Sequence, residues 1–414
     1  MESSENYTVV DLFSGAGGLS LGFDNPERIE QIGEKEYDIT TFSPRFQTEL
    51  AVEYDEDAAE TFEENFEHAT VIEGNITELT AEDILAEVNE DLDVIVGGPP
   101  CKGFSKLNQI KTENLDDDRN ELWEEFHKVV EQAEPQVFVM ENVPRFLKAG
   151  NGTRAYKRFS QDLDYTVRTV VLDADAYETP QARSRGFMIG VLDKEDELKY
   201  TDIPIPTPTS PENPTTLRDV IGNLPYGRKE SKEFDHYWHR VANRATKTIE
   251  RMEIIDPGRG RLQLREAGRE DLIPQCWRDI DDSSFSDYLG RMEWDEPGVT
   301  IRTGFYDPLK GRHLHPEPDN ARTITPLEAA RIQTFPDDFF PTSQSKTAVA
   351  RQIGNAVPPR LGNELAETVH KVLSGEYDGT ALDRYSGASD LTPRVISNVE
   401  EAYNERQETI DKYN

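Results

Sequence analysis

Three short apolar runs in the first half of the chain each end at a turn of glycine, proline or polar residues. They are Tyr7–Leu12, Asp91–Val96 and Gln136–Met140, and stretches with helical periodicity lie between them. A short apolar run that stops abruptly at such residues is typical of a buried strand. Buried strands that alternate with helices form a mostly parallel sheet, whose strands end along one edge. The sequence therefore predicts an α/β fold with its functional loops at that edge.

The same patterns predict the remaining elements. We expect further strands over 50–53, 165–172 and 186–192, and helices over 55–66, 119–133, 326–334 and 361–373. A proline-rich connector at 202–214 precedes a region, 216–320, in which loops and short elements dominate. Residues 24–49 are interpreted as an insertion before the second strand, and residues 351–359 (RQIGNAVPP) as a shaped loop.

Net charge bears on the class of partner. The chain has 45 Lys and Arg against 81 Asp and Glu, a formal charge of −36. We interpret this excess as adaptation to high salt, where a short Debye length screens self-repulsion. Residues 228–269 nevertheless carry more basic than acidic side chains. Apart from chance fluctuation, a surface that meets a polyanion explains this difference.

Composition also excludes several classes of protein. Two cysteines, Cys101 and Cys276, are too few for a disulfide framework or a cysteine-rich zinc site, so we expect no metal centre. No apolar stretch is long enough to span a membrane, and the N-terminus lacks a signal-peptide pattern. We therefore expect a cytoplasmic protein with reduced thiols and no membrane partner.

The loop after the first strand, DLFSGAGG at 11–18, suits a cofactor, because glycine lets the backbone approach a ligand closely. Its spacing departs from the dinucleotide fingerprint, since Ser20 occupies the third glycine position, and this disfavours a nicotinamide enzyme. Glu53 ends the next strand, where a carboxylate can accept hydrogen bonds from ribose hydroxyls. An ordinary tight turn and a solvated acid are the alternatives.

Three later loops carry reactive or charged side chains. GGPPCKGFS at 97–105 holds Cys101 on a stiff turn after a buried strand, where a thiolate would be a nucleophile. An inert buried cysteine is the alternative. Glu141 follows the strand over 136–140 and is expected at the same sheet edge, although an acid at a helix start fits too. Arg183 and Arg185 precede a strand and could bind phosphate, a base edge or surface carboxylates.

Together and in this order, these motifs resemble the cytosine-5 DNA methyltransferase family. The resemblance covers most of the chain except 24–49, much of 200–290 and the tail. Lys102 stands where the family often has glutamine, and Asn75 where many members have aspartate. Six stretches carry it: DLFSGAGG at 11–18, GGPPCKGFS at 97–105, ENV at 141–143, QARSR at 181–185, RTITPLEAARIQTFPDDF at 322–339 and RQIGNAVPP at 351–359.

The resemblance implies an S-adenosylmethionine-dependent methyltransferase fold, a mostly parallel doubly wound sheet with a smaller, irregular target-recognition lobe. Residues 1–195 and 346–375 would form the catalytic and cofactor-binding domain. Residues 196–345 would form the recognition lobe with its supporting helix, and 376–414 a polar C-terminal tail. Candidate DNA contacts in that lobe are Arg228, Lys229, Lys232, Arg240, Arg244, Arg259, Arg261 and Arg265.

The implied reaction transfers a methyl group from S-adenosylmethionine to carbon 5 of a cytosine flipped out of double-stranded DNA. Cys101 would attack carbon 6, Glu141 would favour protonation of the ring, and Arg183 and Arg185 would contact the base. A DNA-modification role would add a cognate restriction endonuclease as a partner. The implied cofactor-binding residues are Phe13, Gly15, Gly17, Glu53, Asn75, Ile76, Pro99 and Asn355.

Three other functions stay open at this point. An amino-methyltransferase would need an Asp/Asn/Ser-Pro-Pro-Tyr/Phe loop, whereas the chain has Gly-Pro-Pro-Cys. A tRNA-methylating branch of the same family would keep the catalytic motifs and differ only in substrate. A catalytically silent DNA-binding relative is disfavoured because Cys101 and Glu141 are both present.

Overall fold

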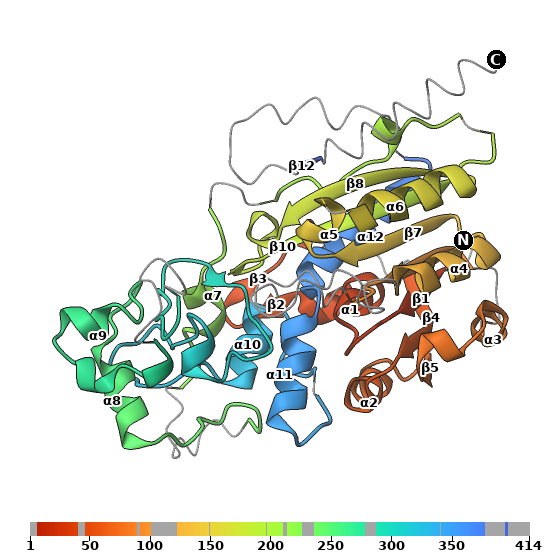
Figure 1. The fold of residues 1–414 in the computed structure, drawn as a ribbon. Coiled ribbons are helices and arrows are strands. Elements are labelled where there is room, and N and C mark those ends of the chain that lie inside the picture. Colours follow the sequence, from red (N-terminus) through yellow and green to blue (C-terminus); the bar gives the residue numbers. More distant parts are fainter. Residues whose placement is uncertain are drawn as a thin grey trace.

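An eight-stranded sheet forms the centre of the molecule (Figure 1). Its strand order is β12-β8-β10-β7-β6-β1-β4-β5. The structure is a computed structural model that describes residues 6–39, 46–88, 92–100, 122–148, 150–195, 197–209, 213–225, 236–277, 287–339, 341–376 and 394–395. The strands are β1 (Tyr7–Leu12), β4 (Phe46–Glu53), β5 (Thr70–Glu73), β6 (Val94–Gly97), β7 (Val137–Asn142), β8 (Tyr165–Asp173), β10 (Ser184–Leu192) and β12 (Arg394–Val395).

The direction of the strands decides where the loops meet. β7, β6, β1, β4 and β5 are parallel neighbours, so their C-terminal ends lie along one edge. β10 is antiparallel to β7 and therefore begins at that same edge. Loops from six strands are thus brought to one side of the sheet, as expected for an open α/β fold.

Helices cover both faces of the sheet, and β1 shows why. Val9 packs in an apolar cluster with Leu361 of α12, whereas Val10 packs in another with Phe126 of α4. Successive side chains of a strand point to opposite faces, so a continuous apolar run needs cover on both. The helices of this region are α1 (Gly18–Asp24), α2 (Glu56–Asn65), α3 (Ala81–Leu85), α4 (Trp123–Ala133), α5 (Pro144–Lys148), α6 (Gly150–Lys157) and α12 (Pro359–Leu373).

The segment between β10 and α12 builds a smaller lobe beside the sheet, with α8 and α9 at its far end (Figure 1). That end has its own apolar cluster, which includes Met252, Leu264 and Leu314. Around Leu217 and Phe335, in contrast, the lobe shares a cluster with the sheet domain. The elements are α7 (Leu217–Ile221), α8 (Thr246–Ile254), α9 (Gln263–Glu266), β11 (Gly298–Val299), α10 (Pro326–Ile332) and α11 (Lys346–Asn355).

Most of the predicted elements are confirmed, and the loss of alternation between 216 and 320 is confirmed too. Two expectations were wrong. The second strand begins at Phe46 rather than Leu50, so the last part of the expected insertion belongs to the sheet. The first half of 351–359 is the end of helix α11, and Gly354 within it lets other backbone approach the helix closely. A Cβ there would lie 2.5 Å from the backbone nitrogen of Thr303.

No helix in the described part of the chain combines the length and apolar character needed to cross a bilayer.

Candidate active site

The turn after β1 is held in an uncommon backbone conformation. Phe13, Gly15 and Gly17 all have positive φ, at 61°, 57° and 90°. At Gly17 the left-handed conformation and close packing both require glycine, since a Cβ would lie 2.5 Å from the ring of Phe66. At Gly15, in contrast, a Cβ would meet nothing within 4 Å. The turn therefore presents backbone to open space on one side.

Glu53, at the end of β4, holds this turn in place. Its Oε2 accepts from the backbone N–H of Gly15 at 2.7 Å, and its Oε1 accepts from the N–H of Asp55 at 2.8 Å. Burial raises the pKa of Glu53, although these hydrogen bonds lower it in part. Each carboxylate oxygen keeps a further lone pair that could accept from a ligand hydroxyl.

The next residue, Tyr54, was not identified from the sequence. Its side chain is 75% exposed and follows β4 directly, at the sheet edge that carries Glu53. An exposed aromatic side chain next to a candidate ribose acceptor is suited to stack on a planar base. Exposure cannot be read from the sequence at a position like this, so no sequence signal marks Tyr54.

Asn75 and Ile76 follow β5 at the same edge of the sheet. The side chain of Asn75 caps a short 3₁₀ turn, because its Oδ1 accepts from the N–H of Thr77 at 3.2 Å. Ile76 is 5% exposed. The amide of Asn75 thus already has a structural role in addition to the predicted cofactor contact.

A hydrogen bond ties the loop after β6 to the end of β7. The side-chain Nδ2 of Asn142 donates to the carbonyl oxygen of Pro99 at 3.0 Å, and Asn142 is buried. Cys101 lies outside the described residues, but this bond fixes the backbone two positions before it. Asn142 is the middle residue of the ENV motif, but no role for its side chain was predicted from the sequence.

Glu141 lies beside this loop, as predicted. A Cβ at Gly98 would come within 2.9 Å of its Oε2. Its Oε1 forms an ion pair with the Nε of Arg185 at 2.8 Å, and both side chains are mostly buried. Burial raises the pKa of Glu141, and the guanidiniums of Arg185 and Arg183 partly offset the effect.

Arg183 is placed differently from Arg185. It is 1% exposed, and its two Nη atoms donate to the carbonyl oxygens of Ile301, Gly354, Asn355 and Ala356. The nearby side chain of Gln181 accepts from the N–H of Ile301 at 2.7 Å. These two side chains therefore join the sheet domain to the smaller lobe and to α11, a role that the sequence did not suggest for them.

Asn355, predicted on the cofactor side, is the last residue of α11. Its side chain is exposed, and its carbonyl oxygen is one of the four that accept hydrogen bonds from Arg183. Its position near the cofactor turn therefore depends on the same junction as the smaller lobe.

The candidate DNA contacts in the smaller lobe fall into different environments. Arg259 pairs with Glu266, and Arg261 is 5% exposed. Arg240 stacks over the ring of Tyr237, and Arg244 donates to the carbonyl oxygen of Tyr306. Neither Arg240 nor Arg244 has a carboxylate partner in the described part of the chain. Arg228, Lys229 and Lys232 lie outside the described residues, and Arg265 has a partner too.

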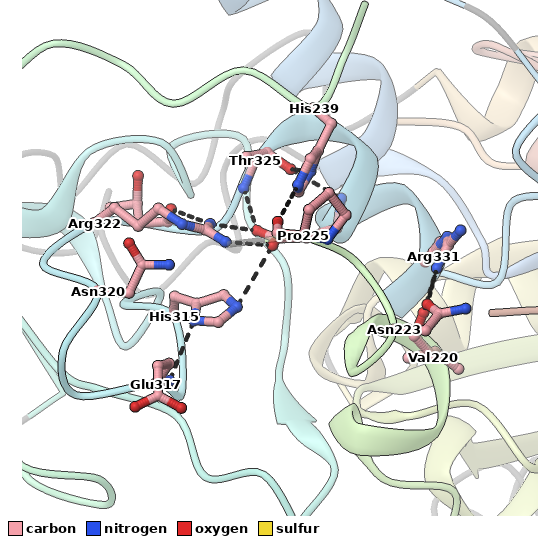
Figure 2. Close-up of polar contacts among 12 residues, drawn as sticks. Val220, Asn223, Pro225, His239, His315, Glu317, Asn320, Arg322, Thr325 and Arg331 are labelled. Carbon is pink, nitrogen blue, oxygen red and sulfur yellow. Dashed lines mark hydrogen bonds and ion pairs between the residues drawn. The ribbon is translucent and has the colours of Figure 1, made fainter. Parts of the chain in front are cut away.

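The stretch 322–339 contains a buried carboxylate, Glu328, around which several side chains of this lobe gather. Arg322 donates to both of its oxygens at 2.6 Å, and the N–H of Thr325 donates at 2.7 Å. Figure 2 shows Arg322, Thr325, His315 and His239 gathered at this point. Burial alone would raise the pKa of Glu328, but the charge and hydrogen bonds of Arg322, together with His315 and His239, outweigh it and lower the pKa to about 2.

Comparisons with known proteins agree with this geometry. Residues 7–371 match the family model described as C-5 cytosine-specific DNA methylase. The chain is 34% identical to the Type II methyltransferase M1.HphI of Haemophilus parahaemolyticus, over 89% of this chain and 88% of that protein. It is 30% identical to the Type II methylase M.HgiDII of Herpetosiphon aurantiacus, over 89% of this chain and 97% of that protein.

Solved structures give the same picture. A protein described as a DNA modification methyltransferase encoded within an E. coli prophage superposes with a TM-score of 0.63 at 25% identity, covering 89% of this chain and 100% of that chain. The S. pombe Dnmt2 methyltransferase superposes with a TM-score of 0.57 at 16% identity, covering 89% of this chain and 99% of that chain. The second likeness concerns the fold alone.

Proposed function

The chain belongs to the C-5 cytosine-specific DNA methylase family, and we propose that it methylates cytosine through a covalent adduct of Cys101 with a flipped base. It is a DNA (cytosine-5-)-methyltransferase of the type II restriction–modification kind, with S-adenosylmethionine as methyl donor. The observation that carries the proposal is the Glu141–Arg185 ion pair beside the loop that leads to Cys101.

The residues along the sheet edge fit S-adenosylmethionine. The space next to Gly15 is open, and the hydroxyl of Ser14 in the same turn is buried with no partner among the described residues. When bound, the cofactor supplies an electrophilic methyl group on a positively charged sulfur. We propose that Glu53 accepts from its ribose and that Tyr54 stacks on its base. The full set that would hold it is Phe13, Gly15, Gly17, Glu53, Tyr54, Asn75, Ile76, Pro99 and Asn355.

The proposed reaction begins at Cys101. Its thiolate forms a bond to carbon 6 of cytosine, and the electron pair of the C5–C6 double bond moves to carbon 5 and the ring. Glu141, whose pKa is raised by burial, places a proton at N3 and so stabilises the charge that develops. Arg185 holds the Glu141 carboxyl in position and faces the same base.

The remaining steps of the reaction need no external oxidant or reductant. Carbon 5 takes the methyl group, whose bonding pair stays on the cofactor sulfur. A base removes the proton from carbon 5, the electron pair re-forms the double bond as the Cys101 sulfur leaves, and the N3 proton returns to Glu141. A cytosine inside a duplex cannot reach side chains at a sheet edge, so the base must leave the stack.

Labelled methyl transfer onto unmethylated genomic DNA and onto tRNA tests the proposal, with Cys101→Ala beside the wild type. We expect 5-methyldeoxycytidine from the wild type only, and unchanged cofactor binding in Cys101→Ala. DNA made with 5-fluorocytosine should trap the enzyme, because fluorine cannot leave as the carbon 5 proton does. A detergent-resistant protein–DNA band that is absent in Cys101→Ala would support the adduct. Methylation by Cys101→Ala would overturn it.

The substrate and the partner are tested separately. Label in tRNA alone would favour the RNA-methylating alternative, and no label with bound cofactor would favour the silent relative. The relatives reported above are named type II methyltransferases, so we propose DNA as the substrate and a cognate restriction endonuclease as a partner. A neighbouring gene whose product cuts only unmethylated DNA would support that partner.

A further inference from the structure

The segment 25–39, which precedes β4, contacts both parts of the molecule. It contains a short 3₁₀ turn, Pro26–Ile29, and a small hairpin of β2 (Gln31–Ile32) and β3 (Lys35–Glu36). None of the six motif stretches falls within it, and the site described above does not use it. Its contacts nevertheless run from the sheet domain to the smaller lobe.

The hairpin turn is seated on α7 of the smaller lobe. The backbone N–H of Glu34 donates to the carbonyl oxygen of Asp219 at 2.9 Å. Gly33 has a φ of +64°, and a Cβ there would lie 2.3 Å from the carbonyl oxygen of Val220. Ile29 and Ile32 are each 1% exposed and share an apolar cluster with the buried residues of α7. A backbone hydrogen bond, apolar packing and a close approach that only glycine permits thus hold the hairpin turn against α7.

The other side of the segment is fastened to the sheet domain. Lys35 Nζ lies 2.8 Å from Oε1 of Glu178, whose Oε2 pairs with Arg360 of α12 at 3.1 Å. Arg28 donates to the carbonyl oxygen of Asn65 at the end of α2 at 3.2 Å. The Nη2 of Arg28 also lies 3.4 Å from Oδ1 of Asp338 in the smaller lobe. Charged side chains therefore hold the segment to both parts of the molecule, and backbone contacts hold it to α7.

From α7 the contacts continue to the active site. The N–H groups of Leu217 and Arg218 donate to the carbonyl oxygens of Glu296 and Trp294, at 3.1 and 2.9 Å. The turn that contains Trp294 and Glu296 leads into β11, which pairs with Gln181–Ala182, and then to Ile301, whose carbonyl oxygen accepts from Arg183. Hydrogen bonds and the short backbone segments between them thus link the hairpin turn to the arginine next to the Glu141 pair.

We propose that residues 25–39 act as an inter-lobe strut that fixes the smaller lobe over the Glu141 site and thereby sets the affinity for DNA. The proposal rests on the proposed function for its substrate, but its mechanical part does not. A lobe held in its binding orientation needs no reorganisation when DNA arrives. If the strut is loosened, only a fraction of molecules has the competent orientation, and the apparent affinity falls by that fraction.

Gly33→Ala is the sharpest variant, because the added methyl group must push the turn away from Val220. Gly375→Ala is its matched control, since Gly375 has a φ of +68° and a Cβ there meets nothing within 4 Å. Both variants carry similar backbone strain, and only one disturbs the contact. The double variant Arg28→Met, Lys35→Met tests the side-chain anchors of the segment and serves if Gly33→Ala does not fold.

Three measurements are made on the full chain: hydrogen exchange of 217–221, the dissociation constant for DNA, and that for S-adenosylmethionine. With Gly33→Ala we expect at least tenfold faster exchange in 217–221 and about tenfold weaker DNA binding, with cofactor binding unchanged within about twofold. The double variant should also speed hydrogen exchange in 217–221 and weaken DNA binding, each by about three- to fivefold. Gly375→Ala should match the wild type.

Unchanged exchange and DNA affinity in Gly33→Ala or in the double variant would overturn the strut. A parallel loss of cofactor affinity would overturn it too, because it would show an effect on the sheet domain itself. If the wild type fails to methylate DNA, the proposed function fails, and the exchange data still decide whether the segment couples the lobes.

Discussion

The Nε of Arg185 lies 2.8 Å from Oε1 of Glu141, and this ion pair joins the start of β10 to the end of β7. The two side chains meet because an antiparallel strand begins where its parallel neighbours end. Burial lowers the pKa of Arg185 and raises that of Glu141. Burial thus leaves a carboxyl that takes up a proton more readily than an exposed one, although Arg185 opposes the effect, and the proposed mechanism uses that proton at a ring nitrogen.

Glu141→Gln should remove the proton donor and keep the shape of the site. We expect a fall in kcat of about 10²- to 10⁴-fold, the usual worth of a positioned acid or base. The affinity for S-adenosylmethionine should not change, since Glu53 and Gly15 lie along the edge by β1 and β4. Single-turnover methyl transfer and a cofactor titration measure the two effects. Glu195→Gln, at an exposed site, is the control, and a kcat within threefold of wild type for Glu141→Gln would contradict the assignment.

Arg183→Met and Arg185→Met should separate stability from chemistry. Loss of Arg183 leaves several buried carbonyl groups without a donor, so we expect the free energy of unfolding to fall by about 3 kcal/mol. Loss of Arg185 should chiefly lower kcat, because it releases the Glu141 carboxyl. Urea unfolding and methyl transfer on both variants measure the split. If Arg183→Met kept full stability and lost only activity, the base-contact role predicted from the sequence would be the better one.

The contrast between these arginines shows what the sequence could and could not predict. The position of Glu141 was predictable, since buried parallel strands end at one edge. The partners of Arg183 are backbone carbonyls at 301 and 354–356, which no residue pattern marks. Glu34 and Asp219 likewise meet through backbone atoms, although they lie far apart in the sequence. Local sequence patterns predicted the helices, the strands and the sheet edge that carries the candidate site. The long-range backbone contacts that join the two lobes could be identified only from the structure.

Glu53→Gln should weaken the cofactor site in particular. Glutamine keeps one acceptor oxygen, so one of the N–H groups of Gly15 and Asp55 loses its partner and the turn loosens. We expect cofactor affinity to fall about tenfold, which corresponds to about 1.4 kcal/mol and to one hydrogen bond to a charged group. Calorimetry with S-adenosylmethionine measures this, and DNA binding without cofactor is the control. Unchanged cofactor affinity would exclude Glu53 from the site.

The formal charge of −36 leads to a prediction on salt. Self-repulsion of a strongly acidic surface opposes folding until salt screens it. We expect the thermal midpoint and the activity to rise with KCl well above 0.1 M. Titrations with KCl, with sucrose as a non-ionic control, measure both. Maximal activity below about 0.1 M KCl would rule out the proposed salt adaptation.

Two buried histidines of the smaller lobe stay neutral in the folded protein. His313 is 1% exposed, and burial lowers its pKa to about 4. His315, beside the Glu328 cluster in Figure 2, is 2% exposed, and burial lowers its pKa to about 3. In the unfolded chain both would bind a proton near pH 6.5. Because the folded pKa is the lower one, each histidine costs stability as the pH falls below 6.5. The buried Asp11 acts in the opposite sense, since burial raises its pKa to about 7.

His313→Gln isolates one of these contributions. Between pH 7 and pH 5 a histidine with these pKa values lowers the free energy of unfolding by about 2 kcal/mol. The variant lacks that titration. Between pH 7 and pH 5, its free energy of unfolding should therefore fall by about 2 kcal/mol less than that of the wild type. Urea unfolding at pH 7, 6 and 5 on both proteins measures the difference, and the contribution of Asp11 cancels because it is common to both. Identical pH dependence would mean that His313 accepts a proton in the folded state despite its burial, and that the carbonyl oxygen of Thr300, which favours the protonated ring, outweighs the desolvation.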